Sequence, residues 1–393
     1  MKKIICILSA VAIFISSVVP VFAHGNNQPF SATADIYAAA ELDISAKSAC
    51  LIEASTGKIL YASDEHSAAS PASITKVMSL LLVCEAIRDG ACSLSDTVTV
   101  SPFAASMGGS QVFLEEGERF TVEELIKCAV IASANDAIVA LAEFISGSEK
   151  AFASKMNEKA RELGLKNTAF ENSTGLDDTT TNHYSSAYDI AVMSSELIKY
   201  DIILKYSSTW QDSIRNGEFT LTNTNRLVRY YDGCNGLKTG STDKAGYCLS
   251  ATAKRGHMQL VAVVMGAESR EQRNVDARAL LDYGFSNFAL FSEEERYLEN
   301  IDILRATVDT LPAYAKKFSV VVPKGKVDAI EITYDIPESV VAPINRGTVI
   351  GKITYELDDV CIGESDIYFE DSVSEVQIWD LIIRLLLRML CGR

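Results

Sequence analysis

The chain has 393 residues, enough for about two or three domains with cores of their own. Its 36 Lys and Arg residues stand against 52 Asp and Glu residues, which gives a formal net charge of −16. Because phosphate contact needs a basic face, this balance argues against a nucleic-acid-binding protein. Apolar residues make up 48% of the chain and charged residues 22%, as in ordinary globular proteins.

Residues 1–23 have the profile of a secretory signal peptide. Lys2 and Lys3 precede a long apolar stretch, and Ala23 ends the partial small-x-small cleavage pattern "VFA". We therefore expect an exported protein cleaved after this segment, with an uncleaved anchor as the alternative. Residues 24–38 are polar and contain Gly and Pro, which indicates a linker.

From about residue 39 the sequence mixes strand and helix patterns. Two alternating runs around "STGK" predict a β-hairpin. The apolar periodicity that follows predicts helices over 74–88, 122–144, 149–163, 186–200 and 270–283, and strands over 246–254 and 259–266. This mixture favours one α/β (α+β) domain over residues 39–291.

Beyond about Phe291 the pattern changes to strands alone. The segments "FSVVVPKG", "AIEITYDIP", "TVIGKITYEL" and "SDIYFED" are separated by Gly, Pro and Asp turns. Residues 292–371 are therefore expected to form a small β-rich domain.

Residues 372–393 predict an amphipathic helix. At helical spacing Gln377, Asp380, Arg384 and Arg388 form a narrow polar stripe, and apolar residues fill the remaining surface. The run is too short and too interrupted to span a bilayer, which needs roughly 20 apolar residues. We expect this helix to lie on the membrane surface, with an ordinary helix packed on the β domain as the alternative.

The cysteines give no disulfide pattern. No two of the nine form a CxxC pair, and Cys84 and Cys128 fall inside apolar helical patterns, as buried thiols do. Their pairing therefore stays open.

The stretch "SPASITKVMSL" places a lysine on the apolar face of a predicted helix. We expect Ser70 and Pro71 to start the helix as N-cap and first residue, which leaves Ser73 free in the first turn. Lys76 follows Ser73 by three residues, on the same helix face. A lysine in apolar surroundings has a lowered pKa, so Lys76 could take the proton of the Ser73 hydroxyl.

An SxxK pair alone is weak evidence, and the chain contains a second one. Ser241 and Lys244, in "STDK", follow a glycine in a loop with no apolar helix behind them. We interpret this second pair as a coincidence.

Two further motifs follow in the chain. Ser133 and Asn135 interrupt an apolar helical pattern in "VIASANDAIVAL", either as an internal hydrogen-bond cluster or as a proton relay with a substrate-binding amide. Lys238, Thr239 and Gly240 open an apolar strand, where they could bind a carboxylate or form a plain turn.

The order SxxK, SxN, KTG resembles the serine penicillin-recognising enzymes. The segments "GGSQVFLEEGERFTVEELI", "SANDA", "FENSTGLDD", "HYSSAYDIA" and "DGCNGLKTGSTDKAGYCLSATA" are similar to the low-molecular-mass penicillin-binding proteins, which are exported serine-type D-alanyl-D-alanine carboxypeptidases. The likeness runs from about residue 40 to the end. It implies a serine β-lactamase/penicillin-binding transpeptidase-like catalytic domain, followed by the β-rich domain and terminal amphipathic helix.

The resemblance implies catalytic roles. Ser73 would be the nucleophile acylated by D-Ala-D-Ala stem peptides of peptidoglycan and by β-lactam antibiotics, Lys76 its base, and Ser133 a proton shuttle. The resemblance implies no cofactor and no metal. It places the protein at the outer face of the cytoplasmic membrane or in the cell wall space, in contact with the membrane surface through residues 372–393.

The resemblance also implies binding roles. The backbone N–H groups of Ser73 and Ser241 would form the oxyanion hole, and some relatives have histidine at the position of Ser241. The other residues expected to hold substrate are Asn135, Lys238, Thr239, Gly240 and Arg273.

Four other functions are alternatives to a D-alanyl-D-alanine carboxypeptidase. A class A β-lactamase needs a glutamate with an asparagine four residues later, and neither Glu162 nor Glu171 has one. A DD-endopeptidase shares the same residues, so this alternative stays open. A wall-binding scaffold would not need the motif residues, and their presence argues against it. Zinc chemistry is poorly supported, because the four histidines form no HxxH-type pair.

Overall fold

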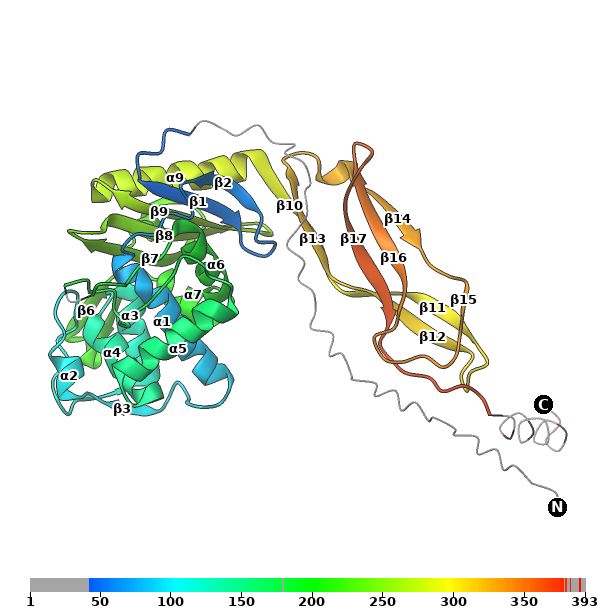
Figure 1. Cartoon of the computed structure of the whole chain (residues 1–393), viewed down its shortest axis with the longest axis horizontal. Helices are drawn as coiled ribbons and strands as arrows, with labels where there is room; N and C mark the ends of the chain where they lie inside the picture. Colours follow the sequence, from blue (N-terminus) through cyan, green and yellow to red (C-terminus); the bar gives the residue numbers. More distant parts are fainter. Residues whose placement is uncertain (1–41, 179, 378, 380–381, 383–388, 390–393) are drawn as a thin grey trace, which may run out of the picture. The chain divides into compact units, whose positions relative to one another are not determined.

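A five-stranded antiparallel sheet organises the first region of the computed structural model, which describes residues 42–178, 180–377, 379, 382 and 389 (Figure 1). The predicted signal peptide and linker lie outside the described residues. The sheet order is β2-β1-β9-β8-β7, with bounds β1 Ser48–Glu53, β2 Ile59–Ser63, β7 Cys234–Thr242, β8 Gly246–Arg255 and β9 Met258–Ala267. The predicted hairpin and both predicted strands are confirmed.

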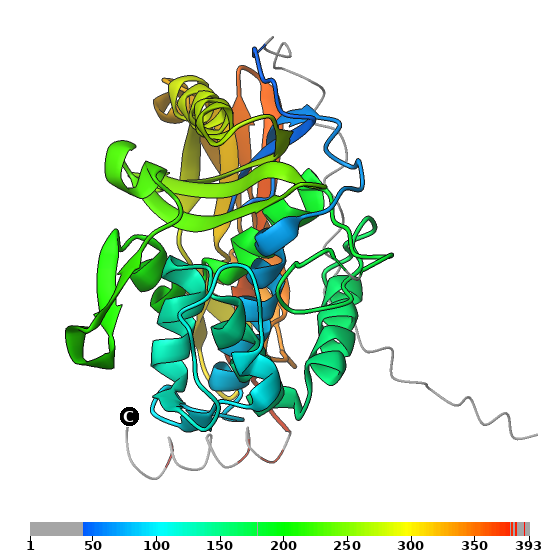
Figure 2. The same ribbon diagram turned by 90° about the vertical axis from the view of Figure 1, so that its left-hand side faces the viewer.

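Helices cover both faces of this sheet. α9 (Arg270–Asn287) packs on one face against β8 and β9, and α6 (Ala187–Leu197) packs on the other. In Figure 2 the yellow-green α9 lies on one side of the sheet and the cyan and green helices on the other. Because both faces are covered, β8 and β9 are buried along most of their length, which explains their nearly continuous apolar sequence.

The remaining helices and strands of this region complete the helical layer and its edges. The helices are α1 (Lys76–Arg88), α2 (Pro102–Ala105), α3 (Val122–Ile131), α4 (Asn135–Ser146), α5 (Glu149–Glu162), α7 (Asp201–Ser207) and α8 (Leu227–Tyr230). Two short hairpins are formed by β3 (Thr97–Thr99) with β4 (Arg119–Thr121), and by β5 (Gln211–Ile214) with β6 (Phe219–Thr222).

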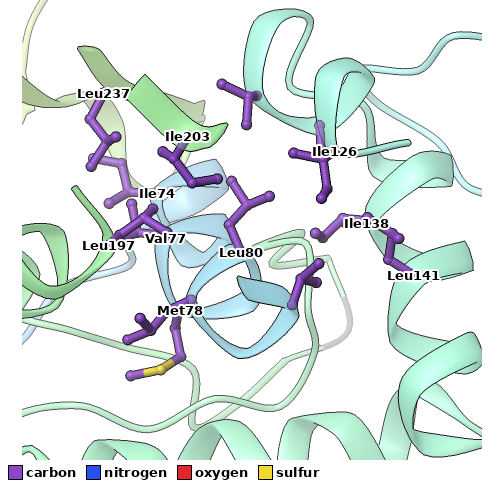
Figure 3. Close-up of a cluster of buried hydrophobic side chains, with 14 of the residues drawn as sticks. Ile74, Val77, Met78, Leu80, Ile126, Ile138, Leu141, Leu197, Ile203 and Leu237 are labelled. Atoms are coloured by element: carbon purple, nitrogen blue, oxygen red, sulfur yellow. The ribbon is translucent and has the colours of Figure 1, made fainter. Parts of the chain in front are cut away.

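α1 runs through the middle of the helical layer and is buried on almost every side. Figure 3 shows Val77 and Leu80 among side chains from other helices, including Ile138 of α4 and Ile203 of α7. A helix that is apolar all round is a core helix, so its position is fixed by packing. Lys76, its first residue, is fully buried.

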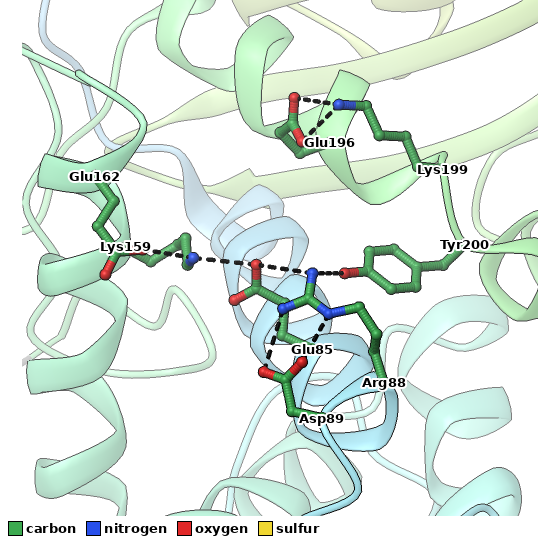
Figure 4. A network of polar contacts seen from close by, with 8 residues as sticks. All are labelled: Glu85, Arg88, Asp89, Lys159, Glu162, Glu196, Lys199 and Tyr200. Atoms are coloured by element: carbon green, nitrogen blue, oxygen red, sulfur yellow. Dashed lines mark hydrogen bonds and ion pairs between the residues drawn. The ribbon is translucent and has the colours of Figure 1, made fainter. Parts of the chain in front are cut away.

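Polar contacts hold the far end of α1 in place. Glu85 Oε1 forms an ion pair with Lys159 Nζ of α5 at 3.0 Å, and Arg88 Nη1 donates a hydrogen bond to the Tyr200 hydroxyl at 3.1 Å (Figure 4). The side chains of Glu85 and Lys159 are only 17% and 18% exposed, whereas that of Arg88 is 56% exposed. These contacts join the end of α1 to α5 and to the segment between α6 and α7.

The helix start differs from the prediction. Ser70 does not cap it: its hydroxyl donates to Asp177 Oδ2 at 3.0 Å, and a 3₁₀ turn, η1 (Ala72–Thr75), precedes α1. The tertiary partner on a distant loop outcompetes the local cap. Ser73 therefore lies in a tight 3₁₀ turn at the N-terminal end of a buried helix.

The prediction of one helix over 122–144 is also wrong. The chain breaks at Ala132–Ala134, between α3 and α4, with Ser133 in the left-handed region at φ 62°. Asn135 N donates to Ser110 O at 2.7 Å, and the buried Asp136 carboxylate accepts from Val112 N at 3.0 Å. These bonds to the neighbouring loop replace helical bonds at the break.

The second region is all β, as predicted. Its six-stranded sheet has the order β14-β16-β17-β12-β11-β15, antiparallel except for the β11–β15 pair. The bounds are β11 Arg296–Leu304, β12 Thr310–Ala315, β14 Glu331–Asp335, β15 Ser339–Val341, β16 Val349–Leu357 and β17 Val360–Phe369, with a separate pair of β10 Phe288–Glu293 and β13 Phe318–Pro323. Phe318 and Tyr355 stack at 4.0 Å in its own core.

The seven cysteines in the described part of the chain are all free thiols. Cys84 and Cys128 are buried, and burial raises the pKa of each to about 12. Both are therefore inert core residues, as their apolar surroundings predict.

Candidate active site

Ser73 lies in a cleft of about 590 Å³, a volume typical of sites for small ligands. Ser133, Thr239, Ser241 and Arg273 line the same cleft. The structure thus brings together residues that are far apart in the sequence and that come from η1, the α3–α4 break, β7 and α9.

Lys76 has a hydrogen-bond arrangement suited to a base. Its Nζ donates to Asn135 Oδ1 at 2.5 Å and to Thr174 O at 2.9 Å, and lies 3.1 Å from Ser73 Oγ. The first two partners are pure acceptors, so they occupy two N–H groups of a neutral amine. The lone pair is then left for the Ser73 hydroxyl proton.

The electrostatics favour this neutral amine. Burial lowers the pKa of Lys76 well below its ordinary value, the nearby charge of Lys238 lowers it further, and Asp136 acts in the opposite direction. Burial and the charge of Arg273 also lower the pKa of Lys238, to about 7. Two lysines with lowered pKa values therefore each contact a serine of the site, Lys76 with Ser73 and Lys238 with Ser133.

The α3–α4 break presents Ser133 and Asn135 to these lysines. Lys238 Nζ donates to Ser133 Oγ at 2.7 Å and to Thr239 O at 2.9 Å. Asn135 bridges Lys76 and the loop before α3, since its Nδ2 donates to Gly108 O at 2.7 Å. A continuous helix could not place both side chains in this way.

β7 passes very close to the η1 turn that carries Ser73. A Cβ on Gly240 would lie 2.8 Å from Pro71 O and 3.1 Å from Ser73 N, so only glycine fits without a shift. Thr239 Oγ1 donates to Thr224 Oγ1 at 2.7 Å beside this contact. The close approach places the strand carrying the KTG motif directly beside Ser73.

Arg273 is a buried cation in the cleft wall. It is 5% exposed, its Nη1 donates to Cys248 O at 3.3 Å, and its Nε has no partner within the described chain. Burial lowers the pKa of Arg273, so an anionic ligand would offset the cost of burying this charge.

Comparison with known proteins identifies the family of this chain. Residues 35–269 match the family model of the D-alanyl-D-alanine carboxypeptidases, peptidase family S11. The chain belongs to this family. Residues 285–375 match the model of the penicillin-binding protein 5 C-terminal domain, which agrees with the all-β region.

Relatives in the D-alanyl-D-alanine carboxypeptidase family cover most of the chain. The D-alanyl-D-alanine carboxypeptidase DacF of Bacillus subtilis is 42% identical over 85% of this chain and 87% of its own. DacC of Escherichia coli is 30% identical over 86% and 88%. Penicillin-binding protein 5 of Haemophilus influenzae superimposes with a TM-score of 0.75 at 32% identity, over 86% of this chain and 100% of that one.

One family structure contains an antibiotic. The ampicillin-bound form of penicillin-binding protein D2 from Listeria monocytogenes has a TM-score of 0.58 and 29% identity, over 63% of this chain and 100% of that one. The match supports the transpeptidase-like catalytic fold expected from the sequence.

Sequence reasoning missed two residues that shape the site. The Thr174 carbonyl holds Lys76, and Asp177 accepts hydrogen bonds from Ser70 at 3.0 Å and Thr242 at 2.6 Å, which joins the segments before Ser73 and after the KTG motif. Both lie in "FENSTGLDD", a segment that carried the resemblance. In the same segment Gly175, at φ 84°, packs against η1.

The second SxxK pair has a different environment. Lys244 is exposed in the turn between β7 and β8, whereas Lys76 is fully buried. The two pairs share a spacing, and only the first has the surroundings of a catalytic base.

Proposed function

We propose that this D-alanyl-D-alanine carboxypeptidase removes the terminal D-alanine of peptidoglycan stem peptides through an acyl-enzyme at Ser73. The observation that carries the proposal is the buried amine of Lys76, 3.1 Å from Ser73 Oγ with its N–H groups held by two acceptors. β-Lactams would acylate the same oxygen.

The proposed acylation uses Lys76 as general base. Its neutral amine takes the Ser73 proton while Oγ attacks the carbonyl carbon of the penultimate D-alanine. Backbone N–H groups of Ser73 and Ser241 stabilise the oxyanion. The C–N bond then breaks, and the leaving D-alanine nitrogen receives a proton through Ser133, which lies 2.7 Å from Lys238 Nζ.

Deacylation reverses these steps with water as the nucleophile. Water adds to the ester carbonyl, its proton goes to the same base, and Ser73 leaves with a proton restored. No Asp or Glu is among the described residues that line the cleft, which disfavours the glutamate-driven water activation of a class A β-lactamase.

We assign the terminal carboxylate to Lys238, Thr239 and Arg273. Lys238 and Arg273 supply the positive charge, and the Thr239 hydroxyl, which donates to Thr224 Oγ1 in this structure, would turn its proton to the carboxylate. The overall charge of −16 would otherwise repel an anionic peptide, so local cations are needed for binding. Asn135 would hold the peptide backbone.

The assay for this function uses the purified protein with a fluorescent β-lactam and with a pentapeptide ending in D-Ala-D-Ala. Covalent labelling together with release of free D-alanine is expected. Labelling without release would favour a wall-binding scaffold, and cleavage of cross-linked dimers in preference to pentapeptide would favour an endopeptidase.

We further propose export of the protein and attachment of its C-terminal segment to the membrane surface. No helix in the described part of the chain is long and apolar enough to cross a bilayer. Most of 372–393 lies outside the described residues, yet Trp379, Ile382 and Met389 are exposed apolar residues within it. Exposed apolar side chains at helical spacing favour an interfacial helix.

Deleting residues 378–393 tests this attachment. The deletion should begin there because Val373 N pairs with Ile344 O at 2.8 Å and Val376 N with Arg305 O at 2.8 Å, within the β region. The truncated protein is expected to remain in the supernatant when sedimented with lipid vesicles, while the full chain pellets. Pelleting of both forms at equal levels would contradict the proposal.

A further inference from the structure

The charge on the cleft walls exceeds what one terminal carboxylate needs. Arg226, Arg270 and Arg273 line the cleft, and no Asp or Glu is among its described lining residues. The chain as a whole, by contrast, has 52 acidic and 36 basic residues. Because Arg273, Lys238 and Thr239 are assigned to the terminal carboxylate, the two other arginines are left without a ligand group.

Arg226 and Arg270 are exposed on well-anchored backbone. Within the described residues neither side chain has an ion pair, so both are available to a ligand. The buried Asn225 donates to Gly236 O at 2.7 Å and ties the first arginine to β7. Ser269 caps α9 and fixes the second at the start of that helix.

Both arginines are near residues assigned to the terminal carboxylate, which belongs to the leaving portion of the substrate. Arg270 is three residues before Arg273 on α9, and therefore one turn away on the same face. Arg226 follows Thr224 by two residues, and Thr224 is bonded to Thr239 of the KTG motif. Both cations are therefore close in the chain to that proposed site, and both line the same cleft.

Aromatic rings border the same end of the cleft. Trp210 and Tyr230 line it, and the guanidinium of Arg229 lies 5.4 Å from the first ring and 5.5 Å from the second. The stacked guanidinium restrains both rings. Flat apolar surface beside free cations suits a leaving group larger than alanine that carries a further anionic group.

We propose that Arg226 and Arg270 bind a second carboxylate on the leaving portion of the substrate. This inference rests on the proposed function and adds a substrate class to it: peptides in which the residue after the scissile bond carries an acid in addition to its α-carboxylate. Such a group could come from an acidic terminal D-residue or from a longer peptide joined through an amine. The shared chemistry is a leaving group with two carboxylates.

The reaction itself is unchanged. The bond between the penultimate D-alanine carbonyl and the leaving nitrogen breaks, the Ser73 ester forms, and the leaving amine takes the proton. Water then hydrolyses the ester. The second carboxylate takes no part in bond making, so its effect is on binding of the leaving group in the ground and transition states.

The test compares diacetyl-L-Lys-D-Ala-X peptides in which X is D-Ala, D-Glu or D-Gln. The D-Glu/D-Gln pair differs only in the second carboxylate, and kcat/KM is measured from release of X. For the wild type we expect a D-Glu/D-Gln ratio of about 10, as for one charge-assisted hydrogen bond. The double variant Arg226→Gln/Arg270→Gln should bring that ratio close to 1. A branched peptide that carries the same two carboxylates on its leaving portion is measured alongside. Comparing its kcat/KM with that of the D-Glu peptide shows whether the two arginines favour a longer leaving peptide or an acidic terminal D-residue.

Arg278→Gln is the matched control, because Arg278 lies on the exposed face of α9 and does not line the cleft. It should leave the ratio as in the wild type. A wild-type ratio of 1, with D-Ala released from the first peptide, overturns this inference alone, whereas no D-Ala release overturns the proposed function. A carboxylate preference that depends on the two arginines only when the acid is in the acyl part would overturn their placement on the leaving side.

Discussion

Replacing Ser73 by alanine is expected to abolish covalent labelling by a fluorescent β-lactam and to lower kcat/KM for D-alanine release by at least about 10⁴-fold. The variant keeps the cleft, both lysines and the carboxylate site, but it has no oxygen to form the ester. Ser73 is in the short 3₁₀ turn η1, directly before α1, so loss of its hydroxyl should not disturb the fold. Gel fluorescence and chromatographic detection of free D-alanine provide the two measurements.

The control for this experiment is Lys244→Ala, in the second SxxK pair. Lys244 is exposed and outside the cleft, so labelling and turnover should stay within about twofold of the wild type, as for most surface substitutions. Equal labelling of the Ser73→Ala protein and the wild type would overturn the assignment of the nucleophile. Loss of labelling in the Lys244 variant would show that the pair of Ser241 and Lys244 takes part in acylation.

The sequence predicts the fold through patterns that tertiary contacts do not alter. The strands β8 and β9 have long apolar runs and appear within one residue of the predicted bounds, and the helix α9 begins at the predicted residue. The order SxxK, SxN, KTG identifies the family, since its three motifs together are far more specific than any one of them. The structure brings all three to one cleft.

What the sequence does not predict depends on distant partners. The α3–α4 break follows from bonds between Asn135, Asp136 and a loop more than twenty residues earlier, and local periodicity favours a continuous helix there. Ser70 has the composition of a cap and instead bonds to Asp177. Arg226 is an exposed arginine with no local signal, and only the structure shows that it lines the cleft.

Replacing Lys76 by methionine is expected to lower the rate constant of β-lactam acylation by about 10³-fold, the usual contribution of a general base. Methionine keeps the apolar stem and removes the amine. Lys76→Arg should be no better, because a guanidinium stays protonated and cannot accept the Ser73 proton. Rapid-mixing fluorescence gives the rate constant, and retention of wild-type rates in either variant would exclude Lys76 as the base.

The pH dependence separates Lys76 from its neighbour. Lys76 must be neutral to react, so the rate should rise with pH through its lowered pKa. The positive charge of Lys238 contributes to that lowering, after burial. In Lys238→Met this charge is lost, the pKa of Lys76 rises, and the acidic limb of the acylation profile should move to higher pH. An acidic limb that stays in place, or moves to lower pH, would mean that the titrating group is not Lys76 or that the two lysines do not interact.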